Sequence, residues 1–127
     1  NFEKAGLKVV YPGLQSHPGH SIMEKQMNKE FGFGGIMTLD VGTLVKANAL
    51  MEMMQKANLG YLAVSLGFYK TLFSAPGTST SSEIPLQEQM AMGLSDGLIR
   101  FSIGLDNDIH RTCERMKECM AKLGILV

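Results

Sequence analysis

Runs in which apolar and polar residues alternate predict the strands of this chain. The clearest run covers 98–104, where Ile99, Phe101 and Ile103 fall on one face of an extended strand. Arg100 falls on the opposite face, in the middle of the run. Three other apolar runs predict further strands, at 7–11, 36–39 and 59–67.

Apolar residues that recur every three or four positions predict helices between these strands. One stripe lies within 44–57 and contains several methionines, which are typical of a packed core. A second stripe lies within 109–123. Its start is marked by two candidate caps, Asp106 and Asn107, and its end by Gly124. Weaker patterns predict two shorter helices, at 20–30 and 85–92.

This order of elements predicts a single α/β domain built as an α+β sandwich. Four short strands would form one small sheet, and the helices would cover one of its faces. The 127 residues suffice to bury a core. The other face would stay open, carry Arg100 and Ser65, and be available to line a cleft.

The segment 69–86 shows no clear pattern. It contains Pro76 and Gly77 and a run of serine and threonine residues around 78–82. The segment is therefore a loop rich in hydroxyl groups, and loops of this length are commonly either functional or disordered.

Charge and composition argue against some classes of partner. Twelve Lys and Arg residues balance twelve Asp and Glu residues, so nothing favours binding to nucleic acid or to an anionic membrane surface. No apolar run approaches the roughly 20 residues of a membrane-spanning helix. Cys113 and Cys119 lie on one predicted helix at a spacing that favours neither a mutual disulfide nor a metal pair. A reducing, cytoplasmic setting is the expectation.

Two histidines and a glycine-rich stretch are weak candidates for a site. His17 and His20 flank a Pro-Gly pair, but no cysteine or carboxylate cluster lies nearby in the sequence. We therefore expect structural histidines and no metal site. The glycines of 31–40 do not follow the pattern G-x-G-x-x-G and no helix opens on them, which argues against a phosphate-binding loop.

Arg100 is the strongest candidate for chemistry, and it has two interpretations. A guanidinium in the middle of a strand stays charged and needs water or an anionic partner. It either lies on a solvated strand face or serves as a receptor for a carboxylate or a phosphate, which its planar fork binds through two hydrogen bonds. The spacing does not decide between the two.

Four stretches, taken together, resemble the C-terminal domain of the pyridoxal-phosphate (PLP) enzymes of cysteine and methionine metabolism, the trans-sulfuration family. They read Y-P-G-L-Q-S-H-P-G-H at 11–20, F-G-F-G-G-I-M at 31–37, L-A-V-S-L-G at 62–67 and G-L-S-D-G-L-I-R-F-S-I-G-L-D at 93–106. The resemblance implies a largely antiparallel sheet. It also places 1–127 as the small C-terminal domain of a larger fold-type I enzyme, whose cofactor-binding domain would lie upstream. The start of the chain, just before a predicted strand, looks like a cut in a longer protein.

The resemblance also implies roles for three residues. Arg100 would bind the α-carboxylate of a sulfur-containing amino acid, and Ser65 would contribute near the same carboxylate. Val64 stands where cystathionine γ-lyases carry an acid; in this respect the chain resembles methionine γ-lyases and suits an apolar thioether. The implied reaction is α,γ-elimination of methionine to a thiol, 2-oxobutanoate and ammonia.

The family's Schiff-base lysine, cofactor-nitrogen aspartate and phosphate-binding residues lie upstream of these stretches. The resemblance therefore implies that PLP is bound by the full-length enzyme, a homotetramer, and that this chain holds no catalytic or cofactor-binding residue. The fragment alone would be inactive. The loop 78–82 departs from the family, because it lacks the histidine of a Met-Thr-His stretch.

Two alternatives stay open. Within the family, the chain could belong to a cystathionine γ-lyase, a cystathionine γ-synthase or an O-acetylhomoserine sulfhydrylase. Outside it, the chain could be a stand-alone module that binds an amino acid through Arg100. An upstream reading frame of large-domain length, with a lysine after a Ser/Thr-rich strand end, would distinguish the enzyme from the module.

Overall fold

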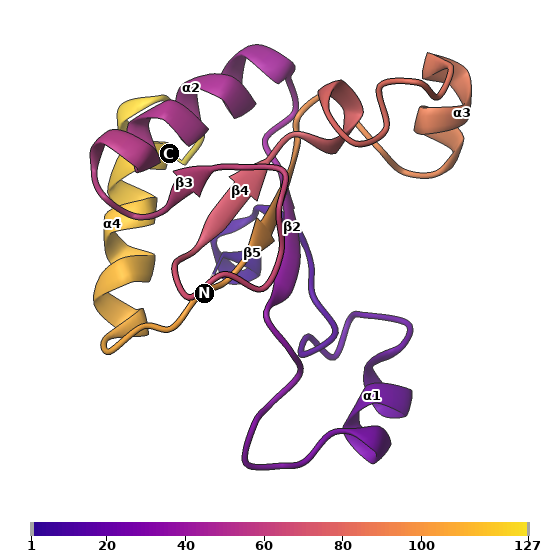
Figure 1. Cartoon of the computed structure of the whole chain (residues 1–127), viewed down its shortest axis with the longest axis vertical. Helices are drawn as coiled ribbons and strands as arrows, with labels where there is room; N and C mark the ends of the chain where they lie inside the picture. Colours follow the sequence, from indigo (N-terminus) through magenta and orange to yellow (C-terminus); the bar gives the residue numbers. More distant parts are fainter. Residues whose placement is uncertain (1, 127) are drawn as a thin grey trace.

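A computed structural model describes residues 2–126 of the chain (Figure 1). In this part, five strands form one sheet in the spatial order β1-β2-β5-β4-β3. The strands are β1 (Lys8–Val10), β2 (Ile36–Asp40), β3 (Tyr61–Leu62), β4 (Leu72–Ser74) and β5 (Leu98–Ser102). Neighbouring strands are antiparallel except β3 and β4, which are parallel. The expected small, largely antiparallel sheet is confirmed.

Within 2–126, four α-helices and two short 3₁₀ helices accompany the sheet. They are η1 (Glu3–Ala5), α1 (His20–Gln26), α2 (Leu44–Lys56), η2 (Pro76–Thr78), α3 (Leu86–Ala91) and α4 (Ile109–Lys122). Figure 1 shows α2 and α4 together on one side of the sheet, whereas α1 and α3 project away from it. None of the helices in the described range combines the length and the apolar character that crossing a membrane requires.

The core lies between the sheet and the helices α2 and α4. Pairing of β2 with β5 puts Leu39 opposite Ile99 on the covered face. Phe101 is paired with Met37 on one side and with Phe73 on the other, and the rings of Phe73 and Phe101 lie 5.9 Å apart. The helices contribute buried side chains to the same cluster: Ala47, Leu50, Met51, Met54, Met116 and Met120. The two predicted stripes therefore pack in the core except Ile109, which is 46% exposed, and α2 and α4 cover one face of the sheet as expected.

Side chains cap the starts of the two packed helices. The hydroxyl of Thr43 accepts from the amide of Lys46 at the start of α2. At the start of α4 the cap is Asp108, which accepts from the amide of Arg111, so the prediction of Asp106 or Asn107 is wrong. The carboxylate of Asp106 instead accepts a hydrogen bond from the amide of Asp108. This bond forms a turn before the helix, which therefore begins after Asp108.

The expected number of four strands is one too few. The missed strand is β4, which lies inside the segment 69–86 that shows no pattern. All three residues of β4 are buried, on both faces of the sheet. Apolar and polar positions therefore do not alternate in β4, and the strand carries no period-two signal.

The third predicted strand is shorter than expected. Of the run 59–67, only the two residues of β3 pair with β4 in the sheet. Farther along, the Arg100 side chain donates a hydrogen bond to the backbone oxygen of Ser65. The hydroxyl oxygen of Ser102 accepts from the amide of Gly67. These side-chain bonds hold the end of the run over the open face, in place of strand pairing.

Gly104 lies just beyond β5, at a point of close approach between two segments. A Cβ atom added there would lie 2.4–2.6 Å from backbone atoms of Tyr69 and Lys70. The amide of Gly104 donates to the hydroxyl of Thr71, and the amide of Leu105 donates to the backbone oxygen of Tyr69. A glycine is needed at this position because any side chain would push the connection between β3 and β4 away from β5.

Because Phe101 is fully buried between Met37 and Phe73, we expect Phe101→Ala to lower the free energy of unfolding by about 3–5 kcal/mol. Phe31→Ala removes the same ring from a side chain that is 75% exposed, and should change that free energy by less than about 0.5 kcal/mol. Urea denaturation followed by circular dichroism measures both. Equal midpoints for the two variants would contradict the placement of Phe101 in the core.

Candidate functional site

Arg100 lies near the centre of the sheet, on the face that α2 and α4 do not cover. β5 runs between β2 and β4, and the register pairs Arg100 with Thr38 on one side and with Ser74 on the other. Directly paired residues of antiparallel strands point to the same face. Thr38, Arg100 and Ser74 therefore form a polar row across the open face.

The protein satisfies the guanidinium of Arg100 only in part. Its Nη2 donates to the backbone oxygen of Ser65 at 3.2 Å, whereas its Nε is buried and has no hydrogen-bond partner within 2–126. The ion pairs in this range involve lysines instead: Lys8–Asp40, Lys56–Glu52 and Lys117–Glu114. A half-buried guanidinium that no described carboxylate neutralises, and that keeps free donors, favours the anion-receptor interpretation over a solvated arginine.

Of the other two predicted site residues, Ser65 contacts Arg100 and Val64 lies at the surface. The contact uses the backbone oxygen of Ser65 and not its hydroxyl. Val64 is 58% exposed, so its side chain is available to a ligand or to another part of a larger protein. Arg100 and Ser65 are thus brought together as expected, while the roles of all three residues stay predictions.

Ser74 is a polar residue of the same row that sequence reasoning missed. It is 4% exposed, and its hydroxyl oxygen has no hydrogen-bond partner in the described part of the chain. A buried hydroxyl without a partner is costly and therefore calls for an explanation. Because β4 shows no alternation, no signal in the sequence placed Ser74 beside Arg100.

Several hydroxyl groups of the Ser/Thr-rich loop form hydrogen bonds within the loop instead of facing solvent. Thr78 and Ser79 both donate from their hydroxyls to the backbone oxygen of Ala75. The buried side-chain amide of Gln89 donates to the backbone oxygens of Ser81 and Ile84, at 2.9 and 2.8 Å. Gln89 of α3 thus fixes the shape of this loop.

Both histidines named above make structural contacts. Nδ1 of His17 accepts from the amide of Gly19 at 3.0 Å. Nδ1 of His20 lies 2.8 Å from the backbone oxygen of Pro12, and its ring stacks on Phe33 at 5.0 Å. Among residues 2–126, no three His, Cys, Asp or Glu side chains are placed to share a metal ion.

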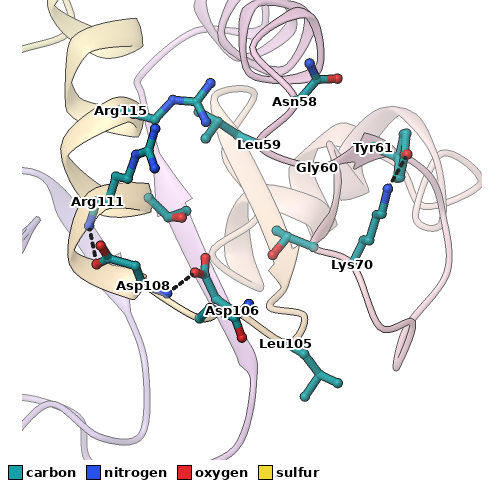
Figure 2. A pocket seen from close by; sticks show the side chains of 13 residues that line it. Asn58, Leu59, Gly60, Tyr61, Lys70, Leu105, Asp106, Asp108, Arg111 and Arg115 are labelled. Atoms are coloured by element: carbon teal, nitrogen blue, oxygen red, sulfur yellow. Dashed lines mark hydrogen bonds between the residues drawn. The ribbon is translucent and has the colours of Figure 1, made fainter.

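A second polar region is a cavity of about 450 Å³ beside β3 and the start of α4 (Figure 2). Lys70 comes from one side of it, and Arg111 and Arg115 come from α4 on the other. Nζ of Lys70 donates to the hydroxyl of Tyr61 at 3.0 Å, and Arg115 donates to the backbone oxygen of Ala57, at the end of α2. The first bond joins the connection before β4 to β3, and the second joins α4 to the end of α2. The cavity contains none of the predicted site residues.

Comparison with known proteins points to one family. A family model described as Cys/Met metabolism PLP-dependent enzyme matches residues 3–115. The chain is 47% identical to a methionine gamma-lyase of Arabidopsis thaliana and 40% identical to a cystathionine beta-lyase of Lactococcus lactis subsp. cremoris, each over 119 residues. The alignments cover 93% and 94% of this chain but 27% and 30% of the relatives. The chain therefore spans less than a third of the length of these relatives.

A solved structure shows the same fold. It is a cystathionine gamma synthase from Xanthomonas oryzae pv. oryzae, in complex with aminoacrylate and cysteine, and it matches with a TM-score of 0.71 at 29% identity. The match covers 93% of this chain and 28% of that chain. The expected fold class is confirmed, with the strand count corrected from four to five.

Covalent attachment of PLP requires a lysine, and Lys70 does not suit that role. Such a lysine attacks as a neutral amine, which a low pKa favours. The hydrogen bond to the hydroxyl of Tyr61 raises the pKa of Lys70. Lys8, on the same face of the sheet as Arg100, is ion-paired with Asp40 at 3.3 Å. The raised pKa of Lys70 therefore disfavours covalent attachment at that amine.

We expect the isolated chain to form no specific covalent adduct with PLP and to release no thiol from methionine. After incubation with PLP and reduction with borohydride, peptide mass spectrometry should find only weak labelling spread over exposed lysines. Lys70→Arg is the matched control, because it keeps the charge, removes the amine and should leave the remaining labelling unchanged. Stoichiometric labelling of a single lysine, together with turnover, would contradict this expectation.

Proposed function

This chain belongs to the Cys/Met metabolism PLP-dependent enzymes, and we propose that residues 1–127 are the small C-terminal domain of a longer lyase of that family. The match over 3–115 and the share of the relatives that the chain spans support this proposal. The large domain upstream would hold PLP and its lysine. No step of the cofactor's chemistry is assigned to residues of this chain.

The activity we propose for the whole protein is that of a methionine γ-lyase. Methionine and water would yield methanethiol, 2-oxobutanoate and ammonia. The relative from Arabidopsis thaliana and the apolar Val64 support this choice. Cystathionine γ-lyase, cystathionine γ-synthase and O-acetylhomoserine sulfhydrylase activities are the alternatives within the family, and a stand-alone amino-acid-binding module is the alternative outside it.

The observation that carries the proposal is the incompletely satisfied guanidinium of Arg100. In this function Arg100 grips the α-carboxylate of the substrate through a planar two-donor fork. Holding the carboxylate fixes one end of the amino acid and so determines which bond at Cα faces the reacting group. Ser65 supports Arg100 from the side, through its backbone oxygen. Val64 provides an apolar wall next to it.

In the full-length protein, Arg100→Ala should lower kcat/KM for methionine, because it should raise the corresponding activation free energy by about 3–5 kcal/mol. This is the scale for truncating one partner of a desolvated charge pair. Arg100→Lys should still be strongly impaired, because lysine keeps the charge but loses the fork. The fold should survive, since Ile99 and Phe101 pack on the other face. Steady-state kinetics and a thermal melt of each variant measure these effects.

Lys8→Ala is the matched control for Arg100. It removes a cation from the same face, but Lys8 is 72% exposed and its ion pair should matter by no more than about 1 kcal/mol. Near-wild-type turnover of Arg100→Ala would end the assignment of the carboxylate to this residue.

Val64→Glu should shift the preference of the full-length protein from methionine toward cystathionine by about 1–3 kcal/mol, the scale of one pocket contact. The new carboxylate can pair with the distal ammonium of the longer substrate, while the methyl thioether loses its apolar wall. Val45→Glu is the control, because Val45 is 79% exposed on α2, far from the open face. If the ratio of the two kcat/KM values stays level in Val64→Glu, Val64 does not line the substrate pocket.

A further inference from the structure

Ser74 and Arg100 carry two buried polar groups that lie side by side without partners. The register pairs the two residues directly across β4 and β5. The hydroxyl oxygen of Ser74 and Nε of Arg100 are both buried, and neither has a hydrogen-bond partner within 2–126. Nearly all buried polar atoms of native proteins are hydrogen-bonded, so two unpaired groups at one register position call for a common explanation.

We propose that Ser74 is a positioning residue of the Arg100 site, whose hydroxyl oxygen accepts the Nε–H of Arg100 when a carboxylate is bound. The bond would fix the plane of the guanidinium. This inference rests on the proposed function in one respect, since it takes a carboxylate as the ligand of Arg100.

The bond would form by rotation of the Ser74 side chain toward Arg100. Directly paired residues in antiparallel strands have Cβ atoms about 4.5–5.5 Å apart, and their side chains point to the same face. A serine hydroxyl has three staggered positions around the Cα–Cβ bond, and it accepts hydrogen bonds as well as donating them. Nε of arginine can only donate. The two groups are thus complementary as acceptor and donor.

This bond leaves a defined set of donors for the ligand. A guanidinium has five N–H groups, one on Nε and two on each terminal nitrogen. Ser74 would occupy the first, and the backbone oxygen of Ser65 occupies one on Nη2. The N–H groups that remain, on Nη1 and Nη2, form the end of the fork that suits the two oxygens of a carboxylate. Ser74 of β4 and Ser65 of the connection between β3 and β4 would therefore hold Arg100 together.

The test compares Ser74→Thr with Ser74→Val in the full-length protein. Both side chains are branched at Cβ, which suits a strand, and they differ only in a hydroxyl against a methyl group. The ligands are L-norleucine, which has the shape of methionine without its sulfur, and n-pentylamine, which is norleucine without its carboxylate. Isothermal titration calorimetry gives the dissociation constant for each variant and ligand.

We expect norleucine to bind at least about tenfold more weakly to Ser74→Val than to Ser74→Thr, as for loss of a hydrogen bond to a charged group. The two variants should bind pentylamine equally, because it has no carboxylate for Arg100 to grip. Equal norleucine affinities would overturn the inference. An equal loss for both ligands would overturn it too, because it would indicate a general disturbance of the site. If neither of these two variants folds, comparison of Ser74→Ala with the wild type gives the same test.

Arg100→Ala, measured with the same two ligands, separates this inference from the proposed function. If Arg100→Ala does not weaken norleucine selectively, the carboxylate assignment fails, and the role of Ser74 fails with it. If Arg100→Ala selectively weakens the binding of norleucine while the two Ser74 variants bind it with equal affinity, only the role of Ser74 is wrong.

Discussion

Burial of Ile99 and Phe101 against α2 and α4 determines what every other residue of β5 does. Side chains of a strand alternate between its two faces, so placing these two in the core puts Arg100 on the opposite face. A slip by one residue would bury the guanidinium among apolar side chains, where an unpaired charge costs far more than the slip could gain. Packing on one face of β5 thus fixes the position of the candidate site on the other face.

Periodic features of the fold could be predicted from the sequence. The alternation in 98–104 placed Arg100 on the face that α2 and α4 do not cover, and the stripes within 44–57 and 109–123 identified the two helices that pack on the sheet. β4 could not be found in this way, because a strand buried on both faces has no polar side to alternate with. The end of the run 59–67 leaves the sheet for a tertiary reason, bonds to side chains of β5 that lie far away in sequence.

The candidate site, like the fold, could be predicted from the sequence only in part. The pattern of elements placed Arg100 and Ser65 on the same face, but their shared role at one carboxylate followed from a family resemblance and not from spacing. The contact itself uses a backbone oxygen. Because every residue has this atom, no pattern of residue types could predict the contact. Ser74 was not predicted as a site residue for a different reason. A single serine among buried residues is ordinary until the register shows what lies opposite.

The parallel pairing of β3 and β4 has a consequence for how substrate preference can change within such a fold. Parallel neighbours cannot be joined by a tight hairpin, so the connection over 63–71 must travel back along the sheet before β4 begins. It does so beside Arg100 and carries exposed side chains, Val64, Leu66 and Phe68 among them. Because these side chains lie outside the core, they can be exchanged at little cost in folding free energy. Under the proposed function, in which this connection lines the substrate pocket, stability and selectivity would therefore rest on separate residues, and one could vary while the other is conserved.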